Sequence, residues 1–189
     1  MDKEKAKQEI VKLVKEFLEY SKDRLNSKKE FQIQSEFIDP LFEALGWDMR
    51  KEAEREERVL KGRADYILRI GNQNKLVIEA KATDVKLDEN EGRQAVSYAY
   101  HRNIKFAILT NFKEIRVYHA LSNIKNIDKN LLKLKDGGLF RLNFNQFLEK
   151  LEELLLLSKD SFENKEINNL LSKKDERLST DEARKIGRL

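Results

Sequence analysis

The chain contains no cysteine, one proline and two histidines among its 189 residues. The absence of cysteine excludes disulfides and thiolate metal sites, and two imidazoles argue against a zinc site of the usual ligand type. Any metal that this chain binds should therefore be a hard cation held through oxygen atoms.

Long apolar runs are missing as well. The mean hydropathy is -0.71, hydrophobic residues make up 40% of the chain, and no run approaches the length of a bilayer span. The segment Met1 to Lys7 is charged and lacks the apolar region of a signal peptide. These features predict a soluble, cytoplasmic protein with no membrane contact.

Neither sign of charge dominates, because 38 basic residues nearly balance 34 acidic ones and leave a net charge of +4. This balance is compatible with a polyanionic partner but is a weak signal for nucleic acid. No G-x-x-x-x-G-K-[ST] loop and no G-x-S-x-G motif is present. The chain is therefore neither an ATP-driven motor of that kind nor a serine hydrolase. Its length fits one core with appended helices.

The most informative stretch reads as two strands joined by a polar turn, from about Val59 to Ile70 and from Lys75 to Lys81. Alternate residues of a strand point to opposite faces, so Glu79 and Lys81 share one face. Burying an acid and a lysine on strands of Leu, Val and Ile is costly unless a metal or substrate partners them. The pattern therefore indicates a functional site.

Asp65, at the start of the first strand, joins this face if the register of the hairpin allows it. An unbroken antiparallel ladder must then pair positions whose numbers sum to an even value. A three-residue loop with Ile70 opposite Asn74 satisfies this condition and sets Asp65 opposite Glu79. A bulge near Gly62–Asp65 is the other solution.

Apolar periodicity also predicts helices and further strands. The helices are expected over Lys3–Leu25, Phe31–Leu45, Glu89–Asn103 and Gln146–Leu157, and the strands over Phe106–Thr110 and Ile115–Tyr118. Pro40 predicts either a kink or two short helices in the second segment. Gly46 stands where a helix C-cap is favoured, and Asn143 or Asn145 is expected to cap the last helix.

Five segments occur in an order that resembles a known family. They are Ile38-Asp39-Pro40-Leu41 through Leu45-Gly46-Trp47, Gly62-Arg63-Ala64-Asp65-Tyr66, Ile78-Glu79-Ala80-Lys81, Gln94-Ala95-Val96-Ser97-Tyr98 and Leu109-Thr110-Asn111-Phe112. Together, from about Phe31 to about Ala120, they resemble the PD-(D/E)xK nucleases. The likeness is to the N-terminal nuclease domain of type I restriction-enzyme subunits and of fused, type IIG-like restriction–modification enzymes.

The resemblance implies an α/β, restriction-endonuclease-like core with a mixed sheet of four or five strands flanked by helices. Residues 1–157 are expected to form the nuclease domain, with an N-terminal helix in 1–28, a core in 31–120 and a C-terminal helix in 143–157. Residues 121–139 are expected to form a loop. Residues 158–189 are expected to form a helical tail or a linker to a further region.

The resemblance also implies hydrolysis of DNA phosphodiesters with Mg²⁺ or Mn²⁺. Asp65, Glu79, the Ala80 carbonyl and Glu36 are the implied metal ligands, and Lys81 would lie beside the attacking water. Gln94 and Tyr98 would contact the scissile strand or steady Lys81.

The implied partners are double-stranded DNA and methyltransferase, specificity or helicase domains or subunits. The alternative is a catalytically silent, nuclease-like module for DNA binding or scaffolding. The intact set of Asp65, Glu79 and Lys81 argues against it, because a binding module does not need a lysine buried beside two acids.

Overall fold

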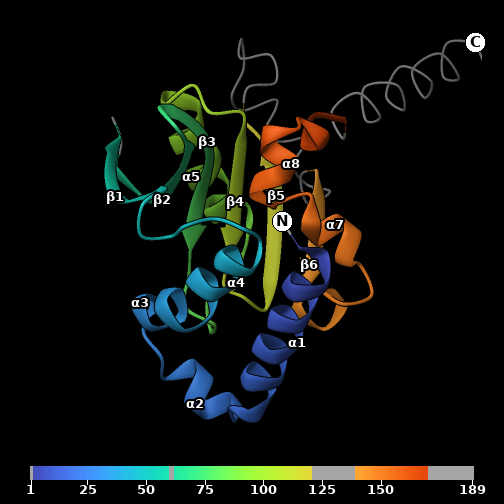
Figure 1. The fold of residues 1–189 in the computed structure, drawn as a ribbon. Coiled ribbons are helices and arrows are strands. Elements are labelled where there is room, and N and C mark those ends of the chain that lie inside the picture. Colours follow the sequence, from blue (N-terminus) through green and yellow to red (C-terminus); the bar gives the residue numbers. More distant parts are fainter. Residues whose placement is uncertain (1, 60–61, 121–138, 170–189) are drawn as a thin grey trace, which may run out of the picture.

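The computed structural model describes residues 2–59, 62–120 and 139–169 (Figure 1). Within these residues one sheet has six strands in the order β1-β2-β3-β4-β5-β6. Strands β3 and β4 are parallel and every other neighbouring pair is antiparallel. The strands are β1 Ala53–Val59, β2 Gly62–Ile70, β3 Gln73–Ala80, β4 Phe106–Thr110, β5 Glu114–His119 and β6 Phe140–Asn143.

Helices cover both faces of the sheet. Figure 1 shows α5 (Glu89–His101) behind the sheet, with α1 (Lys3–Glu19), α4 (Asp39–Ala44) and α8 (Lys159–Glu163) in front. Two separate groups of buried side chains fill the two interfaces. The predicted mixed α/β class is confirmed, and the architecture is consistent with a restriction-endonuclease-like fold. The sheet is larger than expected because β1 and β6 extend its two edges.

The predicted helix Lys3–Leu25 is wrong as a single element. It ends at Glu19, where Tyr20 has an extended backbone, and α2 (Lys22–Asn26) follows. The side chain of Ser21 accepts a hydrogen bond from the Arg24 backbone N–H at 3.2 Å. A serine that caps a new helix in this way favours a break over continuation.

The segment around Pro40 is divided, as one of the two alternatives predicts. It consists of α3 (Glu30–Ile33), the π-helical turn η1 (Gln34–Ile38) and α4, with Pro40 in the first turn of α4. Proline is tolerated there because its missing N–H has no intrahelical partner at that position. Gly46 has a φ of 88° after α4 and confirms the predicted C-cap.

The hairpin differs from the predicted pairing of β2 with β3. The pairing of Ile70 with Asn74 is wrong, because Ile70 pairs with Gln73 across a two-residue turn. A bulge next to Leu68 then shifts the register by one, so that the remaining pairs have even sums. The bulge lies at the turn end of β2, not near Gly62. The paired region ends at Tyr66 and Ile78, and Asp65 and Glu79 are the next residues on the two strands.

The C-terminal segment is less regular than predicted. Residues 143–157 contain the short 3₁₀ helix η4 (Phe144–Gln146) and α7 (Leu151–Leu155), so the predicted helix Gln146–Leu157 is wrong in length. Asn143 precedes η4, and its backbone N–H donates to Gln146 Oε1 at 3.3 Å. The first half of the expected helix is replaced by the end of η4 and by a hydrogen-bonded turn over residues 147–150.

Residues just after Leu157 pack on the same core. The Trp47 indole N–H donates to the Leu157 carbonyl at 2.9 Å, and Phe162 of α8 packs edge-on against the Trp47 ring. Ile167, in the short 3₁₀ helix η5 (Glu166–Asn168), is also buried. Residues 170–189 of the tail or linker expected over 158–189, and nearly all of the loop expected over 121–139, lie outside the described residues. In the part of the chain that is described, no helix is both long and apolar enough to cross a membrane.

Candidate functional site

Three of the predicted site residues, Asp65, Glu79 and Lys81, lie together at the end of β3, on the side of the sheet covered by α5. Ile67 of β2 and Val77 of β3 belong to the buried group that packs against this helix. Alternation from Val77 along β3 puts Glu79 on this side, and the charge of Asp65 acts on Glu79. One Asp65 oxygen, Oδ2, accepts a hydrogen bond from the Ala80 backbone N–H at 2.7 Å. Asp65 is therefore held at the end of β3, next to Glu79.

Glu79 is a buried acid with an incompletely satisfied carboxylate. Its exposed fraction is 2%, and Oε1 lies 2.7 Å from Lys81 Nζ. Oε2 is buried and has no hydrogen-bond partner. Burial, and after it the charge of Asp65, raise the pKa of Glu79 to about 8, although the ion pair with Lys81 acts in the opposite direction. A buried oxygen without a partner is costly, and a bound cation would remove that cost.

Lys81 lies between two carboxylates on different elements. Its Nζ is 2.7 Å from Glu79 Oε1 and 3.2 Å from Glu91 Oε2, at the start of α5. Burial by itself would lower the pKa of Lys81, but the ion pairs with Glu79 and then Glu91 outweigh burial and raise it. Lys81 is therefore a fixed positive charge at the end of β3. Glu91 was not identified in the sequence because it stands outside the recognised motif.

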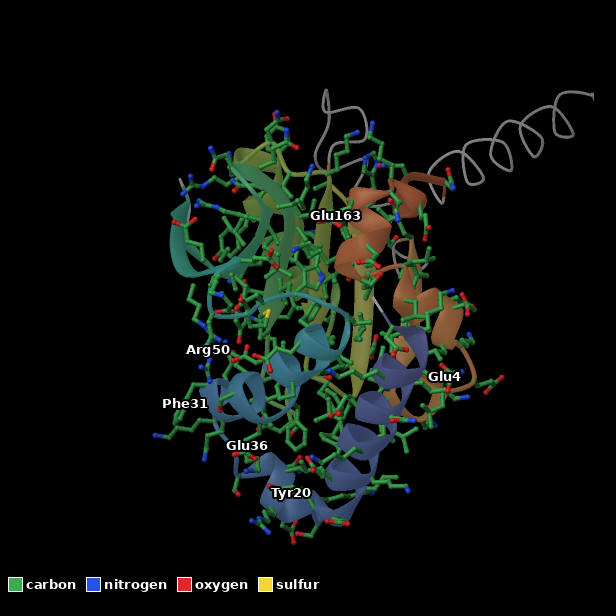
Figure 2. All side chains as sticks on the ribbon, in the orientation of Figure 1. Glu4, Tyr20, Phe31, Glu36, Arg50 and Glu163 are labelled. Atoms are coloured by element: carbon green, nitrogen blue, oxygen red, sulfur yellow. The ribbon has the colours of Figure 1, made fainter. Side chains whose placement is uncertain are left out.

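The helical segment before the strands contributes Glu30 to this site, not Glu36. Burial, and after it the charge of Asp65, raise the pKa of Glu30, and Glu30 in turn acts on Glu79. Glu36 instead lies 2.7 Å from Lys28 Nζ and accepts a hydrogen bond from the Tyr20 hydroxyl at 3.2 Å. Figure 2 shows Glu36 near Tyr20, at the end of the molecule that carries α2 (Lys22–Asn26).

The sequence missed Glu30 for a geometric reason. Two acids six residues apart on a helical segment point in different directions, so only one of them faces the sheet. Glu30 begins α3, directly after the polar break and one residue before the predicted helix Phe31–Leu45, so it stood outside the segment in which a site acid was expected.

Gln94 and Tyr98 lie together on α5, one turn beyond Glu91. The Gln94 side-chain amide donates to the Tyr98 hydroxyl at 2.9 Å, and the Tyr98 ring is buried against the sheet. Their predicted proximity on one helix face is confirmed. The α5 residue that contacts Lys81 is Glu91, so the structure does not bring Gln94 or Tyr98 to that lysine.

A cation would find only part of its coordination ready. Among residues 2–59, 62–120 and 139–169, no three His, Cys, Asp or Glu side chains are grouped as a complete ligand set. Asp65 and Glu79 nevertheless fit a hard cation, because one buried Glu79 oxygen has no partner. Mg²⁺ retains several waters and is commonly held by one or two carboxylates. The donor set therefore suits Mg²⁺ or Mn²⁺ with water completing the shell.

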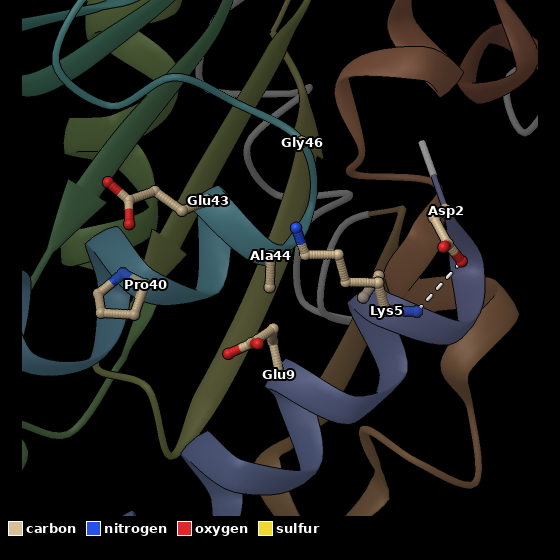
Figure 3. Close-up of a pocket in the computed structure, with 8 residues that line it drawn as sticks. Asp2, Lys5, Glu9, Pro40, Glu43, Ala44 and Gly46 are labelled. Carbon is tan, nitrogen blue, oxygen red and sulfur yellow. Dashed lines mark hydrogen bonds between the residues drawn. The ribbon is translucent and has the colours of Figure 1, made fainter.

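A hollow of about 480 Å³ lies elsewhere, between α1 and α4 (Figure 3). Acidic and basic side chains alternate with small ones around it, and none of them is a candidate site residue. Its lining residues are Asp2, Lys5, Ala6, Glu9, Pro40, Glu43, Ala44 and Gly46. It opens beside the helices that cover the other face of the sheet, away from α5.

The fold and the site define a mixed α/β domain with an acid–lysine cluster at the end of its central strands. Comparison with known families identifies the relationship. This chain belongs to the MmeI N-terminal domain family, whose model matches residues 7–179.

A curated relative is the type II restriction enzyme and methyltransferase RM.Eco57I of Escherichia coli. It is 27% identical to this chain over 172 residues, which cover 82% of this chain. The matched region spans only 16% of that relative's length. No solved structure matches this chain.

Proposed function

We propose that this chain is a metal-dependent DNA endonuclease domain of the PD-(D/E)xK type that acts in restriction–modification. The observation that carries the proposal is the arrangement of Glu79. Its buried carboxylate bonds Lys81 through one oxygen, leaves the other without a partner, and lies close enough to Asp65 for that charge to raise its pKa. The relative RM.Eco57I, named as a restriction enzyme and methyltransferase, supports the same class of activity.

The residues of the site divide the work of phosphodiester hydrolysis. Asp65, Glu79 and the Ala80 carbonyl would hold Mg²⁺ or Mn²⁺. When bound, the cation supplies charge neutralisation on the phosphate and promotes ionisation of a water. Lys81, on the same face as Glu79, would orient the attacking water and stabilise the developing negative charge.

Other acids and α5 side chains would act at the margin of this site. Glu30, whose charge interacts with that of Asp65, would hold water near the acids, which is the role that the resemblance gave to Glu36. Gln94 and Tyr98, which are hydrogen-bonded to each other, would contact the DNA strand. A pair that is already ordered costs less conformational entropy on binding than two free side chains.

The partners proposed beyond DNA follow from the relative. Its name combines restriction and methyltransferase activities, and this chain matches a small part of it. We therefore propose that a methyltransferase region accompanies this domain in a longer protein. Base-specific recognition would then reside largely outside residues 1–157.

The second candidate is a nuclease-like module that binds DNA without cutting it. The incomplete ligand set among the described residues favours this candidate. A nicking assay on supercoiled plasmid with Mg²⁺ or Mn²⁺ separates the two. Cutting by the wild type supports the nuclease, whereas retention of DNA with no cutting under any metal supports the module.

Mn²⁺ affinity is expected to depend on Asp65 and Glu79. Replacing either by alanine should weaken binding by roughly tenfold or more, because each removes a carboxylate ligand. Glu30→Gln should weaken it less, by removing a nearby negative charge, and Glu36→Gln should leave it unchanged. Isothermal titration calorimetry measures these affinities, with thermal melts as the check on folding. Unchanged affinity in Asp65→Ala and Glu79→Ala would place the metal elsewhere.

DNA binding by this chain is expected to be electrostatic and poorly selective for sequence. Phosphate contacts release counterions, so affinity should fall by roughly 100-fold or more between about 50 and 200 mM salt. Fluorescence anisotropy with two unrelated duplexes of equal length measures both properties. Tight binding that is flat across this salt range, or a large preference for one duplex, contradicts the prediction.

A further inference from the structure

Glu91 has no role in the proposed function so far, yet its side chain contacts Lys81, the positively charged residue of the site. Its Oε2 lies 3.2 Å from Lys81 Nζ, and its side chain is 28% exposed. Glu91 and Lys81 come from different elements, ten residues apart, and so their contact is set by how α5 packs on the sheet.

The backbone of Lys81 is fixed, but its side chain needs help. The Lys81 N–H donates to the Thr110 carbonyl at 2.8 Å and extends the β3–β4 ladder. The ammonium group, however, stands on a flexible four-carbon stem that can reach many positions. Glu79 and Glu91 are the two carboxylates that restrict it. The positions of these two carboxylates therefore determine where the ammonium group lies.

A bound cation changes the balance between these two carboxylates. If Glu79 becomes a metal ligand, as the proposed function requires, its carboxylate interacts with the metal ion as well as with Lys81. The ion pair between Glu79 and Lys81 is then weaker. Glu91 lies outside the proposed ligand set and keeps its full charge. It is then the principal anchor of the Lys81 ammonium.

Two features of the first turn of α5 determine the position of Glu91 relative to the sheet. Asp88 caps the helix, and its Oδ1 accepts hydrogen bonds from the backbone N–H groups of Asn90 and Glu91 at 2.8 and 3.3 Å. Gly92 lies so near the sheet that a Cβ there would come within 2.8 Å of the Tyr118 hydroxyl oxygen. The missing side chain lets the helix approach β5, and this approach brings its neighbour Glu91 within reach of Lys81.

We propose that Glu91 is a positioning residue that holds the Lys81 ammonium towards the attacking water. This inference rests on the proposed nuclease function. An alternative is that Glu91 only stabilises the positive end of the α5 dipole. Glu89 has the same opportunity in the same turn, but it contacts Arg93 at 3.7 Å and not the site. The two explanations therefore differ in what they predict for Glu89 and Glu91.

The test compares Glu91→Gln with Glu89→Gln in plasmid nicking by the 189-residue chain. Glu91→Gln should lower the cleavage rate at saturating DNA by roughly 10- to 100-fold, as expected for loss of a supporting contact. The DNA concentration at half-maximal rate, the Mn²⁺ affinity and the melting temperature should stay close to wild type. Glu91→Asp retains the charge on a shorter stem and should recover part of the rate. Glu89→Gln should cut like the wild type.

Two results overturn the inference in distinguishable ways. If the wild type cuts and Glu91→Gln cuts equally well, or if both Gln variants lose the same activity in step with stability, Glu91 does not position Lys81 and the nuclease proposal stands. If the wild type retains DNA but cuts it with neither Mg²⁺ nor Mn²⁺, the nuclease proposal fails, and this inference fails with it.

Discussion

Lys81→Ala is expected to abolish cleavage while leaving Mn²⁺ binding and DNA retention close to wild type. A lysine beside the attacking water acts mainly on the transition state, so its removal should lower the rate by roughly 100- to 10,000-fold with little change in ground-state binding. Asp65 and Glu79 act on metal binding as well, and their variants should lose both properties. The division between the two kinds of loss identifies the role of Lys81.

Mn²⁺ affinity should change little in this variant because two effects oppose each other. Removing the Lys81 charge relieves its repulsion of the cation. The same change raises the pKa of Glu79 further, since the ion pair with Lys81 lowers it, and a protonated carboxyl is a poor ligand. The net effect on cation binding is therefore small compared with the effect on cleavage.

The matched control is Lys75→Ala, at the opposite end of β3. Lys75 donates to the Gln73 side chain at 2.6 Å and takes no part in the site. Supercoiled-plasmid nicking, Mn²⁺ calorimetry and thermal melts on both variants complete the comparison. Wild-type cutting by Lys81→Ala contradicts the role assigned to this residue. Loss of DNA retention together with cutting would instead point to a binding role.

Glu79→Gln is expected to stabilise the metal-free chain at alkaline pH while removing its response to divalent cations. In the folded chain the Glu79 pKa is raised from its ordinary value of 4.5 to about 8. An acid with a raised pKa stabilises the fold while it is protonated. This contribution is complete below about pH 4.5 and is lost as the pH rises through about 8. Glutamine remains neutral throughout and does not lose it.

The size of this effect should be large for one substitution. Each pKa unit of difference between folded and unfolded chains corresponds to about 1.4 kcal/mol, so the loss in the wild type amounts to several kcal/mol by pH 9. Melting temperatures recorded from pH 5 to 9 without divalent ions should fall more steeply for the wild type than for Glu79→Gln. Added Mn²⁺ should raise the melting temperature of the wild type only, because a ligand stabilises the state that binds it.

Glu89→Gln again provides the control, since Glu89 is an acid of α5 with an exposed ion pair to Arg93. Its melting curve should follow the wild type across the pH range and respond equally to Mn²⁺. Parallel profiles for Glu79→Gln and the wild type would show that Glu79 is ionised without cost in the folded chain. The buried Glu79 Oε2, which has no hydrogen-bond partner, would then need another explanation.

Several features of this protein follow from local sequence patterns. The strands β4 and β5 and the helix α5 coincide closely with the segments predicted from apolar periodicity. The shared face of Glu79 and Lys81 follows from strand alternation alone, and their ion pair agrees with it. Such patterns are reliable because they depend on neighbours two to four residues apart, whose relative directions are fixed by backbone geometry.

Strand β1 is an element that local sequence patterns do not predict. Its sequence, Ala-Glu-Arg-Glu-Glu-Arg-Val, has charged residues at five consecutive positions and no apolar alternation. It forms a strand because the free edge of β2 offers backbone partners, and charged edge strands resist further pairing. The bulge beside Leu68 is likewise a property of the β2–β3 pairing, not of either strand alone.

The composition of the site was decided by tertiary structure in the same way. Sequence alone selected Asp65, Glu79 and Lys81, because they stand on strands whose faces can be counted. Only packing determined that Glu30 faces the acids, that Glu36 turns to Lys28, and that Glu91 reaches Lys81. These contacts join elements whose relative positions depend on how buried side chains fill the space between helix and sheet, and no spacing along the chain encodes that directly.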